Sequence, residues 1–124
     1  IIVGLTIDRN ELYERIDRRV DKMIENGLVD EVKFLLSKGY RANSPGLKAI
    51  GYKEIIDYFN DEISLEEAIN QIKKNTRNYA KRQFTWFKKM DNVVWFDYKE
   101  KEIIKSYIKQ EIIKLKDEKM WTNY

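Results

Sequence analysis

Two short apolar runs, far apart in the chain, are its only clear strand signals. They are IIVGLTI at residues 1–7 and VVWF at residues 93–96, and short β-branched runs of this kind favour buried strands. A strand needs neighbours that satisfy its backbone groups and cover its apolar faces. The two runs can pair with each other, but two strands alone make a poor sheet. We therefore expect a mostly α-helical chain whose two strands belong to a larger sheet.

Helical spacing of apolar residues fills the segment between the two runs and resumes after the second. Asp8 and Ser64 each precede a glutamate by three residues, as in the capping box that begins a helix. Gly39 is a typical residue for the end of a helix, and Gly51 indicates a bend or a close backbone approach. The tail at 117–124 is expected to fray. Helices are predicted over residues 8–27, 28–38, 48–59, 64–89 and 100–115.

The long helix at 64–89 carries most of the positive charge. Residues 73–89 hold seven cationic side chains, whereas the whole chain has a net charge of only +3. On a helical wheel, five cations fall within an arc of roughly 100°. The opposite side is expected to face the core. The cationic edge consists of Lys73, Lys74, Arg77, Lys81 and Lys88, and the core side of Leu65, Ile69, Ile72, Tyr79, Gln83 and Phe87.

No acidic residue interrupts this basic edge. Between Ala68 and Met90 there is neither Asp nor Glu, although a solvated helix normally places opposite charges four residues apart. Repulsion among the cations is unrelieved within the helix, so an anionic partner such as the phosphates of a nucleic acid is expected. A simply solvated basic face is an equally good interpretation of the charge pattern alone.

Two further segments carry candidate binding groups. Arg15 and Arg19 lie on one face of the first helix, either as surface ion pairs with neighbouring carboxylates or as a clamp for phosphate oxygens. AIGYKE at 49–54 follows Lys48 and contains Lys53, but is a weak signal by itself.

Composition excludes several kinds of site. The chain has no cysteine and no histidine, which excludes disulfides, thiolate or imidazole metal ligands and Ser–His–Asp chemistry. No apolar run approaches the ~20 residues that span a bilayer. A reducing cytoplasm is the expected location. Because the chain begins with isoleucine and not methionine, we expect a fragment or a processed product.

Three segments together resemble one family. LTIDRNELYERIDRRVDKMIENGLVDEV, AIGYKE and TRNYAKRQFTWF occur in the order and approximate spacing of bacterial tRNA dimethylallyltransferases, also called isopentenyl transferases. The resemblance covers residues 3–97, whereas residues 98–124 carry no family signature. The predicted division is a family portion at 1–97 followed by a C-terminal helix and tail at 98–124.

The resemblance implies a P-loop-type α/β enzyme. Such an enzyme moves a dimethylallyl group from dimethylallyl diphosphate to the exocyclic amine of the adenosine 3′ of the tRNA anticodon. Mg²⁺ is expected in the intact enzyme, with no metal ligand in this chain. The intact enzyme is expected to be monomeric, with the tRNA anticodon arm as partner and no membrane contact.

The resemblance also implies roles for particular residues. Arg19 matches an arginine near the prenyl diphosphate and is the candidate catalytic residue, offsetting charge on the departing pyrophosphate. Arg77 and Lys81 are the leading candidates for phosphate contact. Arg82 lies elsewhere on the wheel, so a role in organising the fold is open for it. The implied tRNA-binding residues are Lys48, Lys74, Thr76, Arg77, Asn78, Lys81 and Arg82.

The chain departs from the family pattern in one large respect. It contains no G-x-x-x-x-G-K-[ST] loop and no segment that supplies the family's catalytic aspartate. We therefore expect the C-terminal portion of the enzyme, inactive by itself. The alternative is a free-standing helical module that binds nucleic acid or is purely structural.

Overall fold

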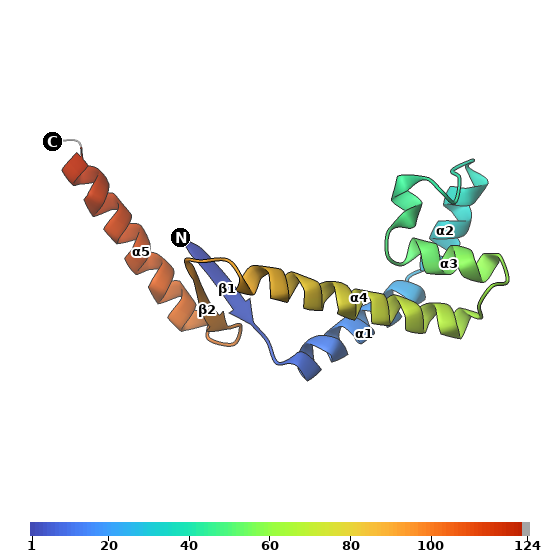
Figure 1. Ribbon diagram of the computed structural model, residues 1–124, viewed down its shortest axis with the longest axis horizontal. Coiled ribbons are helices and arrows are strands. Elements are labelled where there is room, and N and C mark those ends of the chain that lie inside the picture. Colours follow the sequence, from blue (N-terminus) through green and yellow to red (C-terminus); the bar gives the residue numbers. More distant parts are fainter. Residues whose placement is uncertain (123–124) are drawn as a thin grey trace. The chain divides into compact units, whose positions relative to one another are not determined.

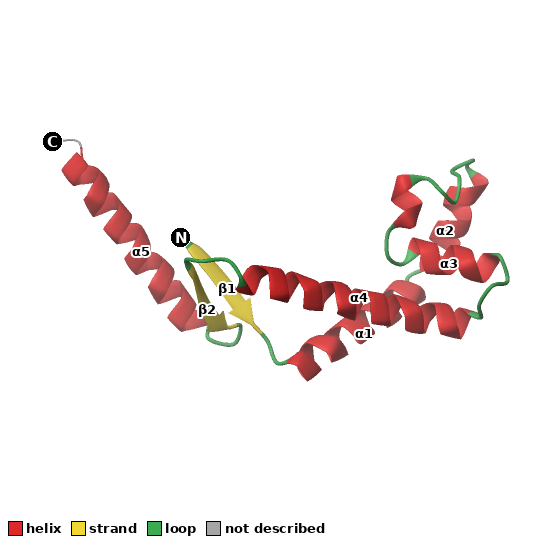
Figure 2. Ribbon diagram, viewed as in Figure 1, coloured by secondary structure: helices red, strands yellow, loops and turns green. Residues whose placement is uncertain are grey.

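The chain is mostly helical, as the sequence predicts, with two short strands (Figures 1 and 2). The computed structural model describes residues 1–122, and side chains as far as residue 118. In chain order the elements are β1 (Ile2–Thr6), α1 (Arg9–Glu25), α2 (Leu28–Ser37), the 3₁₀ helix η1 (Pro45–Lys48), α3 (Tyr52–Phe59), α4 (Leu65–Lys88), β2 (Val93–Asp97) and α5 (Lys101–Thr122).

Two element boundaries differ from prediction. The helix expected at 48–59 is divided into η1 and α3, because Ala49 is extended and Gly51 has a φ of 102° that side chains rarely adopt. Helix α5 continues to Thr122, so the predicted fraying is wrong for residues 117–122. Residues 123 and 124, also in the predicted frayed tail, lie outside the described residues.

Residues 9–87 form one compact unit with a hydrophobic core to which α1, α2, η1, α3 and α4 all contribute. Val32, Ile55 and Ile72 are its largest fully buried side chains. Burial of each such side chain stabilises the fold by roughly 1.5–3 kcal/mol. The complete cluster consists of Val20, Leu28, Val32, Leu47, Ile55, Ile56, Ala68 and Ile72.

A second unit comprises residues 1–8 and 88–124. In it β1 and β2 pair in parallel, with Ile2 opposite Val93 and Thr6 opposite Asp97. Parallel strands need a long crossover connection, and here the helices of residues 9–87 supply it. The aromatic rings of Phe96 in β2 and Tyr107 in α5 lie 5.3 Å apart.

The two-stranded sheet leaves apolar surface uncovered. Ile2, Leu5 and Val94 are exposed in this structure. The strands do pair with each other, as the sequence allows. The expectation that they also belong to a larger sheet remains a prediction.

The pairing of β1 with β2 requires glycine at position 4. Gly4 lies opposite Trp95, and a Cβ at position 4 would come within 2.5 Å of the Trp95 ring. No real Cβ tolerates such a distance, so either the indole or the strand would have to move. The close approach of ring and backbone explains a glycine inside a strand, where it is otherwise unfavourable.

We therefore expect Gly4→Ala to lower the free energy of unfolding by about 1–3 kcal/mol, the usual effect of overpacking. Gly46→Ala is the matched control, because nothing lies within 4 Å of a Cβ at that position. Thermal unfolding followed by tryptophan fluorescence measures both variants. Equal melting temperatures for the two would contradict the packing of Trp95 over Gly4.

Candidate nucleic-acid interface

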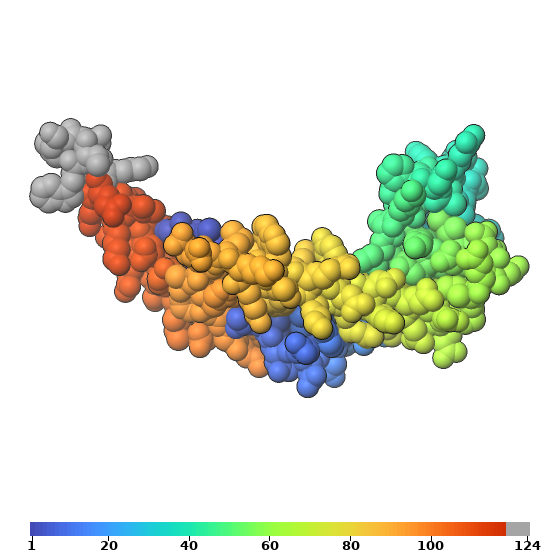
Figure 3. Space-filling model, in the orientation of Figure 1, coloured from blue at the N-terminus to red at the C-terminus, as the bar shows by residue number. Residues whose placement is uncertain are grey.

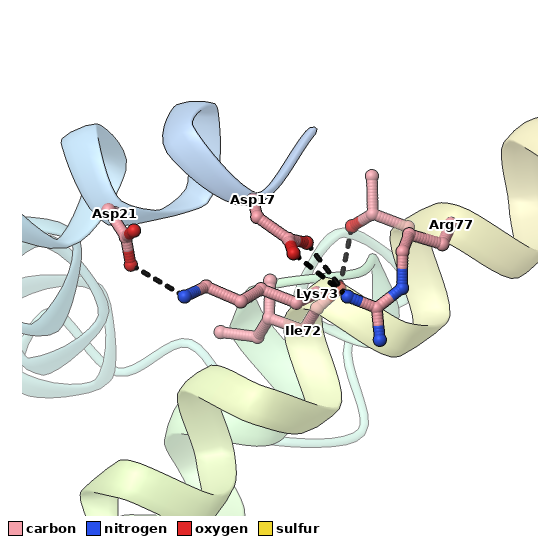
Figure 4. Close-up of polar contacts among 6 residues, drawn as sticks. Asp17, Asp21, Ile72, Lys73 and Arg77 are labelled. Atoms are coloured by element: carbon pink, nitrogen blue, oxygen red, sulfur yellow. Dashed lines mark hydrogen bonds and ion pairs between the residues drawn. The ribbon is translucent and has the colours of Figure 1, made fainter. Parts of the chain in front are cut away.

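Two cations of α4 are paired with carboxylates of α1 (Figure 4). Lys73 Nζ lies 2.8 Å from Asp21 Oδ1. Arg77 Nη1 donates to both Asp17 oxygens, at 2.8 and 3.1 Å. The guanidinium carbon of Arg77 also lies 5.9 Å from the centre of the Tyr13 ring. Carboxylates of α1 therefore offset the repulsion between these two cations of α4. The anionic partner of Lys73 and Arg77 is part of the same chain.

These two ion pairs are partly shielded from water. The side chains of Lys73 and Arg77 are only 21% and 31% exposed. Partial burial weakens solvent screening, although the carboxylate of Asp21 remains about half exposed. Lys73 and Arg77 thus belong to the contact between α1 and α4.

A second, outer edge of the basic face is free of ion pairs. Lys74, Lys81 and Lys88 follow at intervals of seven residues and are all exposed, which places them in one row along the helix. Arg82 is exposed as well. The structure shows no ion pair for any of these four within the described residues. This row is the part of α4 that is available to an anionic partner.

Two polar residues predicted to bind tRNA differ in their surroundings. Asn78 is exposed next to the row of lysines. Thr76 is partly buried, and its hydroxyl donates to the Ile72 carbonyl at 2.7 Å. The hydroxyl proton of Thr76 is therefore already used inside the helix, whereas the amide of Asn78 can contact a ligand.

The predicted core side of α4 is correct only for its first half. Ile72 is buried, and Leu65 and Ile69 are partly buried against the core. Tyr79, Gln83 and Phe87 are exposed, Tyr79 by 51%. Their placement in the core was wrong, because the other helices of this unit cover only the first half of α4. The second half lies at the surface, in yellow to orange in Figure 3.

This surface includes an aromatic pair. Trp86 is 62% exposed, and its ring meets that of Phe87 edge to face, with centroids 5.0 Å apart. Exposed aromatic rings next to cations are typical of surfaces that stack on nucleic-acid bases.

The AIGYKE segment is joined to α4 by a buried carboxylate that sequence reasoning missed. Glu54 is 3% exposed and accepts hydrogen bonds from the Gly51 backbone N–H at 2.7 Å and from Asn75 Nδ2 at 2.8 Å. The spacing of Gly51 and Glu54 is that of a capping box and was visible in the sequence. The partnership with Asn75 was not, because it joins residues 21 positions apart.

Lys48 and Lys53 line an open cavity of about 570 Å³ between η1, α3 and the loop before them. Apolar side chains of Leu47 and Ile56 contribute to its walls, together with the carboxylate of Asp57. Lys48 is exposed. Its ammonium group is thus placed where a ligand that contacts this surface can reach it.

Arg19 differs from the two neighbouring arginines of α1. Arg15 pairs with Glu11 at 3.3 Å and Arg18 with Glu14 at 3.7 Å, each within the helix. Arg19 is exposed, and no ion pair involves it in the part of the chain that the structure describes. Of the three arginines Arg15, Arg18 and Arg19, the one selected by sequence is therefore the one without an ion pair among the described residues.

The contact between α2 and α3 includes one perturbed phenol. Tyr52 donates its hydroxyl proton to Glu31 Oε1 at 3.0 Å. The hydrogen bond to this carboxylate, together with partial burial and the nearby negative charge, raises the pKa of Tyr52. The shift favours the protonated phenol, which is the form that donates this hydrogen bond.

Neither a metal site nor a membrane span is formed by the described residues. Among them, no three side chains of the metal-binding types gather closely enough to hold a metal ion. None of the described helices combines the length and apolar character needed to cross a bilayer.

Comparisons with known proteins identify one family. The family model described as IPP transferase matches residues 1–90. A tRNA dimethylallyltransferase of Thermoanaerobacter sp. is 55% identical over 112 residues, covering 87% of this chain and 36% of that protein. One of Alkaliphilus oremlandii is 57% identical over 95 residues, covering 77% and 30%. The chain spans about a third of the length of the curated relatives that it matches.

Solved structures agree. The full-length tRNA isopentenylpyrophosphate transferase of Bacillus halodurans superposes with a TM-score of 0.84 at 45% identity, covering 94% of this chain and 41% of that one. A tRNA isopentenylpyrophosphate transferase of Staphylococcus epidermidis gives a TM-score of 0.80 at 38% identity, covering 91% and 37%.

Because the buried Glu54 carboxylate satisfies two donors, we expect Glu54→Leu to lower the free energy of unfolding by about 2–4 kcal/mol. Each buried donor left without a partner costs about 1–3 kcal/mol. Glu66→Leu is the matched control, since Glu66 is exposed in the first turn of α4. Chemical denaturation of both variants measures the difference. Equal stability of the two would show that the Glu54 hydrogen bonds contribute nothing.

Proposed function

This chain belongs to the IPP transferase family, and we propose that it is the tRNA-binding portion of a tRNA dimethylallyltransferase. In this proposal the intact enzyme joins the exocyclic nitrogen of the adenosine 3′ of the anticodon to the dimethylallyl carbon. The carbon–oxygen bond to diphosphate breaks, and pyrophosphate leaves. The base that accepts the amine proton lies outside this chain, which spans about a third of its relatives.

The observation that carries the RNA-binding role is the exposed, unpaired row of cations on α4. Lys74 and Lys81 lie on this row, with Asn78 beside it. Each phosphate that a lysine neutralises releases condensed counterions, which favours binding to RNA. The exposed side chain of Arg82 and the ammonium group of Lys48 extend the positive surface to two further positions.

Arg77 and Thr76, also predicted to bind tRNA, have partners inside the protein. For Thr76 the hydroxyl oxygen remains able to accept a hydrogen bond. All the hydrogen bonds of Arg77 to Asp17 leave from Nη1. A phosphate contact through the remaining nitrogens of Arg77 stays a hypothesis, and it competes with a purely internal role for this side chain.

Arg19 is proposed to face the diphosphate of the prenyl donor. Its guanidinium is exposed and has no ion pair with any described residue, which supports this role because a fixed cation stabilises the charge that develops on departing pyrophosphate. The planar fork of arginine binds such oxygens in a bidentate manner.

Mg²⁺ is proposed for the intact enzyme, with ligands supplied from outside this chain. The enzyme is proposed to be a cytoplasmic monomer. The competing hypothesis is a helical module without catalysis that binds nucleic acid or is purely structural. A measurement of prenyl transfer distinguishes the two hypotheses, whereas a measurement of RNA binding alone does not.

We expect Lys74→Ala combined with Lys81→Ala to weaken binding of the 124-residue chain to a tRNA anticodon stem-loop. The slope of log K against log salt should fall by about 1.4–1.8, because two phosphate contacts are lost. Fluorescence anisotropy at several salt concentrations measures both quantities. Lys33→Ala combined with Lys105→Ala removes the same charge from exposed positions on α2 and α5 and is the control. If both double variants weaken binding equally, net charge and not the α4 row determines affinity.

Arg19→Ala tests the catalytic role in a full-length enzyme in which this chain replaces the matching segment of the Thermoanaerobacter relative. We expect turnover to fall by about 10²- to 10³-fold, the usual effect of removing one group that stabilises developing charge, with tRNA affinity little changed. Arg18→Ala, at the neighbouring exposed position, is the control. Normal turnover of Arg19→Ala at every donor concentration would eliminate this role.

A further inference from the structure

The two ion pairs between α1 and α4 form a matched set. Asp17 and Asp21 are one helical turn apart on α1, and their partners Arg77 and Lys73 are one turn apart on α4. The two pairs run in opposite directions along the two helices, with Asp17 opposite Arg77 and Asp21 opposite Lys73. The set therefore connects α1 to α4 at two successive turns.

Arg19 lies between the two aspartates in sequence but on the other side of the helix. Two residues advance an α-helix by about 200°, so Arg19 points away from the side that carries Asp17 and Asp21. Its exposed side chain agrees with this direction. One side of α1 is thus held by α4, and the other presents the arginine. Any rotation or shift of α1 moves Arg19 with it.

An RNA phosphate is a poor ligand for the paired edge. A phosphate close to Arg77 would also approach the carboxylates of Asp17 and Asp21, both of which are partly exposed. The negative phosphate and the negative carboxylates would repel each other. Arg77 would also have to give up its contact with Asp17 to bind the phosphate. The outer row with Lys74 and Lys81 involves neither cost.

We propose that Asp17 and Asp21 are positioning residues that orient Arg19 by holding α1 on α4 through Arg77 and Lys73. This inference rests on the proposed function, since it takes Arg19 to face the prenyl diphosphate. It assigns Arg77 to the organisation of the catalytic arginine and leaves RNA contact to the outer row. The two parts of the basic face thus have different tasks.

The test uses the full-length enzyme described for Arg19. The variants are Asp17→Asn, Arg77→Gln, the charge reversals Asp17→Arg and Arg77→Asp, and their combination. For Asp17→Asn and Arg77→Gln we expect kcat/KM for the prenyl donor to fall by about tenfold, because small misplacement of a reacting group lowers rates by up to about 10²-fold and the Lys73–Asp21 pair remains. The tRNA Kd and its salt slope should change less than twofold. The combined reversal should recover most of the activity that either single reversal loses.

The matched control is the pair Glu14 and Arg18, which lies on α1 itself and is well exposed. Reversal of both its charges should leave kcat/KM and tRNA affinity unchanged. A purely structural role for Asp17 predicts that activity at temperatures well below unfolding matches the parent, and this result would overturn the proposal. So would a combined reversal no better than the single ones.

A third result would assign Arg77 to the RNA. If Arg77→Gln weakens tRNA binding and lowers the salt slope while Asp17→Asn does neither, Arg77 contacts phosphate and the proposal is wrong. Failure of the proposed function would be seen elsewhere. It would appear as unchanged RNA binding on loss of Lys74 and Lys81, and as unchanged turnover on loss of Arg19.

Discussion

The burial of the first half of α4 is the constraint on which the helical unit depends. Ile72 and Ala68 pack with Val32 and Ile55 in one hydrophobic cluster, and each large side chain in it contributes roughly 1.5–3 kcal/mol. A partly exposed ion pair contributes up to about 1 kcal/mol. Hydrophobic burial therefore determines that α1, α2, α3 and α4 associate. The charged pairs at the edge of the core add two contacts between α1 and α4.

The cations of α4 have no acidic partner nearby in the sequence, yet some of them form ion pairs in the folded protein. Each of the two cations nearest to α1, Lys73 and Arg77, has a carboxylate within 2.8 Å. The outer cations, Lys74, Lys81 and Lys88, have no such partner among the described residues. One basic face thus carries an internal contact and an external binding surface. The distance of each cation from the carboxylates of α1 determines whether it is paired. A helical wheel of α4 alone does not contain this distance.

Local signals predicted much of the fold. Ser64 accepts the Glu67 N–H at 3.1 Å, as the capping box indicated, and Gly39 adopts the positive φ typical of a helix end. Signals that depend on a neighbour were less informative. Tyr79, Gln83 and Phe87 lie on the apolar side of the wheel, yet no helix of the unit covers them. Glu54 is buried and accepts a hydrogen bond from Asn75 of α4, a contact that local signals do not show.

The sequence by itself determined the helices, the two strands, the basic run and the family, because each depends on residues close together in the chain or on motifs in a fixed order. It also selected Arg19, whose neighbours Arg15 and Arg18 pair within the helix. Only the tertiary structure decided which cations of α4 are paired. The Arg77–Asp17 contact joins residues 60 positions apart, and its existence depends on how the hydrophobic core brings two helices together. The charge pattern of α4 shows where its cations are, and packing against α1 determines that Lys73 and Arg77 have a partner.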